Sequence, residues 1–154
     1  DASALVAEMC DLQLLAHENE AALATLPGLA GWWTEETTGD SSGGAAIKFV
    51  FHLETGELLG GFDMDVIELS PSDKVRWRVK DGPPEWIGTT IEFGLSRQDD
   101  YTVVLFRHGG WREEVEFMAH CSTKWAVFLV SLRDLVETGK GRPAPDDLRI
   151  GNWH

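Results

Sequence analysis

Apolar side chains recur at steps of three and four residues between Ser122 and Gly139, which is the clearest periodic pattern in the chain. The positions that carry the pattern are Trp125, Phe128, Leu129, Leu132, Leu135 and Val136. This spacing aligns them on one helical face. Ser122 suits an N-cap and Gly139 a C-cap, so the pattern predicts an amphipathic helix about 25 Å long. Such a helix needs a large apolar surface to cover its face.

Residues 45–118 change to an alternation of apolar and polar side chains, interrupted by turn signals such as SPSD and DGPP. A period of two is typical of strands that bury one face. Six strands are therefore predicted, at residues 46–53, 62–69, 74–80, 87–95, 101–108 and 112–118. The short turns between them predict an antiparallel meander that packs against the C-terminal helix.

The N-terminal part of the chain permits two interpretations. Apolar positions in residues 5–15 fit helical spacing, whereas residues 11–14 alternate as an edge strand does. Residues 20–26 (EAALATL) favour a short helix. Residues 35–44 are polar and glycine-rich, which predicts a loop, and residues 140–154 lack any periodicity, which predicts a C-terminal tail.

Aromatic residues are numerous, with seven tryptophans and seven phenylalanines in 154 residues. Trp32 and Trp33 are adjacent and lie just before the glycine-rich loop. They form either a plug in the core or the lip of a pocket. The core plug is favoured because buried aromatic rings are common and pockets are few per protein. A surplus of rings is nevertheless typical of proteins that line an apolar cavity.

The chain is acidic, because 13 basic and 26 acidic residues give a net charge of −13. Phosphate binding needs clustered Lys and Arg, so this charge argues against a nucleic-acid or membrane partner. Cys10 and Cys121 are the only cysteines, and their spacing matches neither a disulfide framework nor a zinc site. No apolar run reaches the length of about 18 residues that a membrane span needs, and no signal peptide is visible. We therefore expect a cytoplasmic protein without metal or cofactor.

Four stretches resemble, in the same order, a known pattern: residues 29–34 (LAGWWT), 86–90 (WIGTT), 108–111 (HGGW) and 120–125 (HCSTKW). The pattern is that of the START-like superfamily (SRPBCC), which includes the polyketide cyclases and the birch-pollen allergen. The branch that the chain resembles is named for activators of the heat-shock-protein-90 ATPase. The resemblance covers about residues 23–154. It is specific for the fold and weak for function, because one fold hosts many activities.

This resemblance implies an α+β helix-grip fold. A curved antiparallel sheet of six to seven strands would wrap around the long C-terminal helix, with short helices near the N-terminus. We expect one START-like domain over residues 1–154, with residues 140–154 as its tail. Family members usually begin with a strand, an alanine–proline turn and a helix that bears apolar residues. Residues 14–20 instead read LLAHENE, so residues 1–22 form an atypical N-terminal segment.

An apolar cavity between the sheet and the final helix is also implied by the resemblance. Strand parity selects the side chains that would line it, with the two adjacent tryptophans at its mouth. The expected ligand-binding residues are Trp32, Trp33, Phe49, Phe51, Phe62, Met64, Trp77, Phe93, Phe106, His108, Trp125, Phe128 and Leu129. The alternative is that these side chains pack together and leave no space for a ligand.

Few residues are candidates for catalysis. They are His108, His120, Asp63, Glu113, Glu114 and Cys121. A histidine near a carboxylate can act as a general base, and a cysteine at a helix N-terminus can ionise. A histidine beside a glycine turn more often bonds to backbone, however, and such a cysteine is more often a small buried hydrophobe. No catalytic residue is therefore assigned.

Three functions remain open at this point. The favoured one is a module that binds an apolar or aromatic small molecule, oriented by His108 or Asp63. The second is a co-chaperone-like module whose acidic surface docks on a basic protein partner. The third is an enzyme of the cyclase or hydrolase kind that uses His108 or Glu114 for proton transfer. Either a monomer or a homodimer is compatible with the sequence.

Overall fold

The computed structural model describes residues 7–14, 19–70 and 72–152. The elements in these ranges are, in chain order, β1 (Ala7–Leu14), α1 (Asn19–Ala24), α2 (Leu26–Ala30), β2 (Glu36–Gly39), β3 (Ala46–His52), β4 (Leu58–Ser70), β5 (Lys74–Asp81), β6 (Thr90–Gln98), β7 (Tyr101–Gly109) and α3 (Glu116–Thr138).

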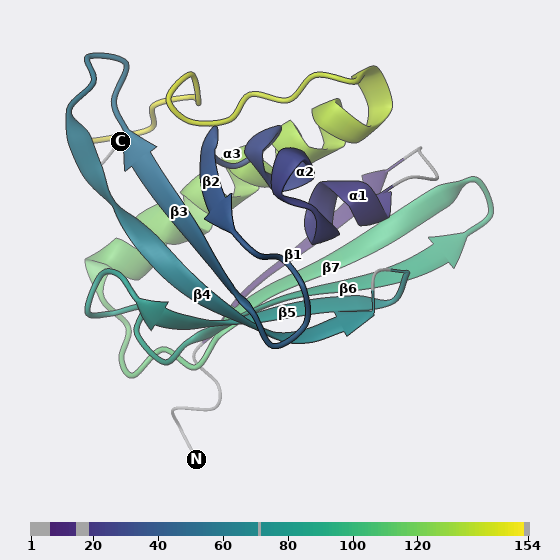
Figure 1. The fold of residues 1–154 in the computed structure, drawn as a ribbon, viewed down its shortest axis with the longest axis horizontal. Helices are drawn as coiled ribbons and strands as arrows, with labels where there is room; N and C mark the ends of the chain where they lie inside the picture. Colours follow the sequence, from purple (N-terminus) through teal and green to yellow (C-terminus); the bar gives the residue numbers. More distant parts are fainter. Residues whose placement is uncertain (1–6, 15–18, 71, 153–154) are drawn as a thin grey trace.

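The strands form one seven-stranded sheet in the order β1-β7-β6-β5-β4-β3-β2. Every pair of neighbouring strands is antiparallel. Helix α3 crosses the opening of the curved sheet, and the short helices α1 and α2 lie beside it (Figure 1). This arrangement confirms the predicted α+β helix-grip fold. Within the described ranges, no helix combines the length and the apolar character needed to cross a membrane.

The N-terminal segment, for which the sequence allowed either a helix or an edge strand, forms a strand. Strand β1 pairs with β7 from Ala7 opposite Gly109 to Leu14 opposite Thr102, so the strand interpretation is the right one. The short helix predicted nearby is present as α1 and is followed directly by α2. Thr25 caps α2, because its side-chain oxygen accepts a hydrogen bond of 3.1 Å from the amide of Gly28.

Helix α3 begins earlier than its apolar repeat suggested. Its N-cap is Val115, so the predicted N-cap at Ser122 is wrong, and so is the predicted strand over residues 112–118. In the first turns of the helix Cys121 is buried and Phe117 is partly buried against the core, which extends the apolar face toward the N-terminus. The predicted C-cap is confirmed, because Gly139 has a φ of 85° and its amide donates to the carbonyl of Leu135 at 2.9 Å.

Two further corrections concern the strands β2 and β4. The predicted loop over residues 35–44 contains β2, whose pairing with β3 gives the sheet its outer strand. The glycine pair at residues 60–61 lies inside β4. A Cβ atom on Gly61 would stand 2.6 Å from the carbonyl oxygen of Phe49 on β3, so glycine is required for the two strands to approach.

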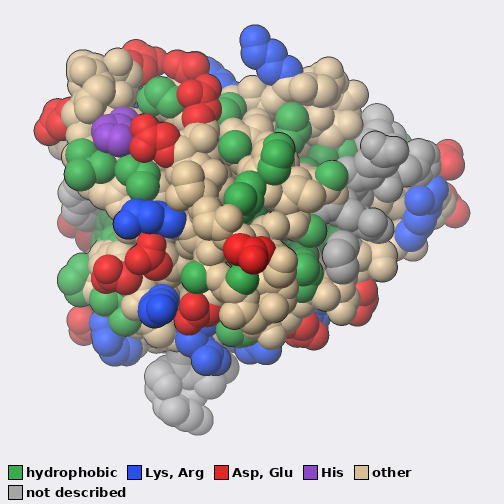
Figure 2. All heavy atoms as spheres, viewed as in Figure 1, with side chains coloured by type: hydrophobic (Ala, Val, Ile, Leu, Met, Phe, Trp, Pro, Cys, Tyr) green, Lys and Arg blue, Asp and Glu red, His purple; other side chains and the backbone are tan. Residues whose placement is uncertain are grey.

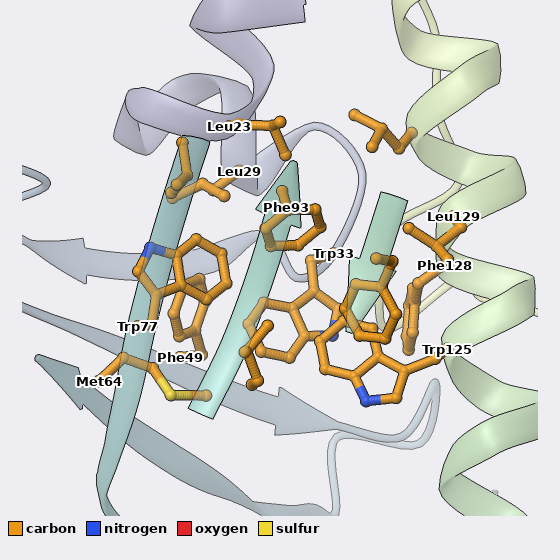
Figure 3. Close-up of a cluster of buried hydrophobic side chains, with 14 of the residues drawn as sticks. Leu23, Leu29, Trp33, Phe49, Met64, Trp77, Phe93, Trp125, Phe128 and Leu129 are labelled. Carbon is orange, nitrogen blue, oxygen red and sulfur yellow. The ribbon is translucent and has the colours of Figure 1, made fainter. Parts of the chain in front are cut away.

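Aromatic rings occupy most of the space between the sheet and α3. Trp33 is at the centre, with its ring centroid 4.3 Å from that of Phe49, 5.0 Å from Trp125 and 5.9 Å from Trp77. Figure 3 shows Trp125 and Phe128 projecting from α3 toward Trp33, while the strand residues approach from the opposite side. Trp33 is only 2% exposed, and the predicted role of core plug therefore fits its burial.

The segment after α3 returns along the helix toward the β3–β4 hairpin (Figure 1). The Ser131 hydroxyl donates to the carbonyl of Trp32 at 2.8 Å and accepts from the amide of Arg142 at 2.7 Å. Ala144 exchanges two backbone hydrogen bonds with the chain next to β2, at 2.9 Å with Trp33 and 3.1 Å with Glu35. The predicted tail is therefore bonded to the domain between Arg142 and Leu148, and it contributes Ala144 and Asp147 to a pocket.

Candidate functional site

A pocket of about 200 Å³ opens between the N-terminal half of α3 and the start of β4. Its lining residues are Trp33, Phe51, Leu59, Gly60, Gly61, Phe62, Pro83, Trp86, Phe117, His120, Cys121, Lys124, Trp125, Phe128, Ala144 and Asp147. Most of these side chains are apolar, and the ionisable groups are confined to α3 and the C-terminal segment. The pocket is therefore an apolar slot with a polar side.

The wall formed by α3 follows from helical spacing. Phe117, Cys121, Trp125 and Phe128 occur at steps of four and three residues, so they share the face that looks toward the sheet. The opposite wall belongs to β4 and to the turn before β6. There Phe62 and Trp86 stack almost parallel, with interplanar angle 9° and centroids 4.3 Å apart.

A hydrogen-bonded chain of buried groups lies behind the aromatic walls. The indole N–H of Trp125 donates to Nδ1 of His108 at 3.1 Å. An indole nitrogen can only donate, so Nδ1 is the acceptor and the proton of the neutral ring is on Nε2. That N–H donates to the Thr89 hydroxyl at 2.8 Å, and the hydroxyl donates to the carbonyl of Trp86 at 2.6 Å. The chain thus connects two walls of the pocket through one imidazole.

His108 is fully buried, and burial lowers its pKa to about 3. The cause is desolvation, which disfavours the charged imidazolium. At neutral pH the ring is uncharged, with its tautomer fixed by the chain of hydrogen bonds just described. It does not line the pocket, so its place in the structure suits the positioning of Trp125 and Trp86 rather than direct contact with a ligand.

The polar side of the pocket is an ion pair between Lys124 on α3 and Asp147 in the C-terminal segment. Lys124 Nζ binds Asp147 Oδ2 and also donates to the carbonyl of Leu148 at 2.5 Å. The ammonium lies 5.2 Å from the centroid of the Phe128 ring, within the range of a cation–π contact. The two charged side chains are only 13% and 15% exposed, so water screens this pair less than it screens a surface pair.

The structure divides the predicted ligand-binding residues into two groups. Those that line the pocket are Trp33, Phe51, Phe62, Trp125 and Phe128. Those that it places instead in the packed core beside or beneath the pocket are Trp32, Phe49, Met64, Trp77, Phe93, Phe106, His108 and Leu129. Strand parity identified the inward direction correctly, but most inward side chains contact each other rather than open space.

Sequence reasoning missed several lining residues. They are Leu59, Pro83, Trp86, Phe117, His120, Cys121, Lys124, Ala144 and Asp147. Phe117 and Cys121 lie eight and four residues before Trp125, so extending the apolar repeat toward the N-terminus would have found them, whereas His120 and Lys124 are polar and carry no such signal. No sequence signal marks Ala144 or Asp147, because they lie in a segment without regular structure.

The candidate catalytic residues are dispersed. His120 and Cys121 line the pocket, whereas Asp63 borders an adjoining hollow of about 550 Å³ that shares residues 59–62 and Pro83 with the pocket. Glu113 and Glu114 are exposed before α3. Among the described residues, no group of three or more His, Cys, Asp or Glu side chains is arranged to hold a metal ion. Figure 2 shows acidic and basic side chains interspersed on one face of the molecule.

The curved sheet, the helix across it and the pocket between them define a protein of the START-like class. No protein-family model matches the chain, and a search of curated proteins found no match. Solved structures do match. The solution structure of the Aha1 dimer from Colwellia psychrerythraea is 39% identical, with a TM-score of 0.76 over 89% of this chain and 100% of that one.

More distant structures share the fold. CalU16 from Micromonospora echinospora is 17% identical, with a TM-score of 0.70 over 91% of this chain and 71% of that one. The major latex-like protein 151 from Panax ginseng is 10% identical, with a TM-score of 0.64 over 88% of this chain and 97% of that one. The chain belongs to the Aha1-like branch of the START-like (SRPBCC) superfamily, as its sequence motifs predicted.

Proposed function

We propose that this protein is a binding module that holds one small aromatic or apolar molecule in the pocket between α3 and β4. The observation that carries the proposal is the pocket itself, an open volume of about 200 Å³ within a set of aromatic walls. An apolar protein cavity of about 150 Å³ is enough to bind benzene. The pocket is below the range of about 300–1,000 Å³ that is usual for drug-sized ligands, so we expect a single ring with a short substituent.

The walls support this proposal because they are held in place before a ligand arrives. Trp125 and Trp86 are connected through His108 and Thr89, and the C-terminal segment is bonded to α3 and to the chain before β2. A rigid apolar pocket loses little conformational entropy on binding. Burial of the ring would supply most of the affinity, at roughly 25 cal/mol for each Å² of apolar surface removed from water.

The test of this proposal fills the pocket with a side chain. Cys121→Met extends a lining residue into the open volume, whereas Ser122→Met places the same side chain at the next helical position, outside the lining. Binding of isopropylbenzene and other single-ring compounds would be followed by amide chemical shifts. We expect wild type and Ser122→Met to bind and Cys121→Met to lose binding. Failure of wild type to bind any single-ring compound would overturn the proposal.

Native and denaturing mass spectrometry of the freshly purified protein would search for a natural ligand. An excess of native mass that disappears on denaturation, with a matching small molecule in the extract, identifies an occupant. This measurement comes before the binding series, because a retained ligand would compete with the added compound.

We also propose that the protein forms a homodimer. The support is the 39% identical Aha1 structure, which was solved as a dimer. Leu58 and Leu59 at the start of β4 are 62% and 45% exposed, and they offer apolar surface for a second copy. Sedimentation velocity of wild type, Leu58→Asp and the control Leu105→Asp tests this. We expect only Leu58→Asp to lower the mass, and a monomeric wild type would refute the proposal.

A further inference from the structure

The ionisable groups of the pocket allow the class of ligand to be narrowed, on the assumption that the proposed binding function is right. We propose that the Lys124–Asp147 pair selects a neutral single-ring molecule with one hydrogen-bond acceptor, such as an aryl ketone, in preference to a hydrocarbon or an aryl carboxylate. Both side chains line the pocket, and both are largely buried.

The Lys124 ammonium has more hydrogen-bond donors than the protein uses. An ammonium group has three N–H donors. Within the described part of the chain two acceptors are in place, the carboxylate of Asp147 and the carbonyl of Leu148. One donor therefore remains for an acceptor on a ligand that enters the pocket. Lys124 is the only lysine or arginine among the lining residues that the structure describes, so its charged donor orients the ligand through the acceptor.

The opposite charges of Lys124 and Asp147 disfavour an anionic ligand. Asp147 neutralises Lys124, so an entering carboxylate meets a negative group as close as the positive one. Repulsion from Asp147 offsets attraction to Lys124, while the carboxylate still loses its hydration on entering an apolar slot. A ketone oxygen receives a hydrogen bond from a charged donor and loses much less hydration. The pair therefore discriminates against an anion even though it contains a lysine.

The Phe128 ring sets where the ligand's substituent can lie. The Lys124 ammonium lies 5.2 Å from the Phe128 centroid, so the polar group is directly beside an aromatic wall. A ligand whose ring contacts the wall thus has its substituent near the ammonium when that substituent is short. This geometry favours an acceptor attached directly to the ring or one atom away from it.

The experiment compares three compounds of closely matched size: isopropylbenzene, acetophenone and benzoate. Dissociation constants come from amide chemical-shift titrations of the full chain. We expect acetophenone to bind at least about ten-fold more tightly than either of the others, which is the effect of one charge-assisted hydrogen bond. Equal affinities for acetophenone and isopropylbenzene, or tighter binding of benzoate, would overturn the inference while leaving the proposed pocket intact. Binding of none of the three would instead refute the proposed function.

Two variants and a control test the residues directly. Asp147→Asn leaves the lysine charge uncompensated, so we expect the preference for acetophenone over benzoate to fall by about ten-fold or to reverse. Lys124→Met keeps a long apolar side chain and should abolish the preference for acetophenone over isopropylbenzene. Lys74→Met, which removes the lysine of a partly exposed pair with Glu92 outside the pocket, should leave every ratio unchanged. Unchanged ratios in Asp147→Asn would contradict the charge argument even if Lys124→Met does not fold.

Discussion

The chain of hydrogen bonds through His108 makes a sharp prediction about Thr89. This threonine is 1% exposed, and valine has nearly the same shape, so Thr89→Val removes a hydroxyl without opening a cavity. The Trp86 carbonyl keeps its bond of 2.9 Å from the Thr89 amide. The Nε2–H of His108 loses its acceptor, and it cannot exchange tautomers because Nδ1 already accepts from Trp125.

The expected cost is that of the hydrogen bond lost between the Thr89 hydroxyl and His108. Disrupting a buried hydrogen bond destabilises a protein by about 1–3 kcal/mol, and both residues here are buried. With a urea dependence of about 2 kcal/mol per M, the unfolding midpoint should fall by roughly 0.5–1.5 M. Tryptophan fluorescence reports the transition, because the rings lie in the same cluster as His108.

Two controls separate this explanation from a general effect of substitution. Thr89→Ser keeps the hydroxyl and should lose less stability than Thr89→Val. Thr38→Val makes the same change at an exposed position on β2 and should shift the free energy of unfolding by no more than about 0.5 kcal/mol. The reasoning is refuted if Thr89→Val matches wild type within that margin, or if the serine variant is as unstable as the valine variant.

Three further predictions follow from other contacts. The folded pKa of His108 is about 3 and its unfolded pKa about 6.5, so this group should not affect the unfolding free energy above pH 6.5 and should lower it by about 1.4 kcal/mol per pH unit below pH 6.5. Assigned His108 imidazole signals that titrate near pH 6.5 in the folded protein would contradict this. Gly61→Ala should destabilise the protein by roughly 1–3 kcal/mol in urea melts, because its Cβ would overlap the facing carbonyl on β3; full stability would show that the strands move apart easily. Ser131→Ala should lower the free energy of unfolding by about 1–3 kcal/mol, since the carbonyl of Trp32 and the amide of Arg142 lose their shared partner. Amide hydrogen exchange should also become faster in the segment after α3.

Periodicity predicted most of the fold because it reports which face of an element is buried. It failed where short-range pattern and tertiary packing disagree. Val115 and Phe117 alternate as in a strand, yet Phe117 belongs to the helical face of α3. Ile87 alternates with its neighbours in the sequence, but it lies in the turn before β6 and is 41% exposed. In both places two or three residues are too few to distinguish a period of two from one of 3.6.

The pocket was harder to predict than the sheet, for a geometric reason. The alternation of side chains along the strands predicts that Phe93 and Phe106 point inward. The structure confirms this, since both are fully or almost fully buried. Whether an inward ring meets another ring or open space depends on distances across the sheet, which no local pattern contains. Asp147 illustrates the same limit, because only tertiary structure brings it to Lys124.

The volume left open in this aromatic core is itself informative, because protein interiors are normally packed as densely as organic crystals. Filling an unused cavity usually stabilises a protein, by about 0.5–2 kcal/mol for one well-chosen substitution. If the pocket exists for binding, Cys121→Met should raise the free energy of unfolding while it abolishes ring binding, so that stability and function change in opposite directions. If the open volume is only a packing defect, Cys121→Met should still raise the free energy of unfolding, but wild type should bind no single-ring compound. Urea melts and ligand titrations on the same preparations therefore distinguish a binding pocket from an imperfect core.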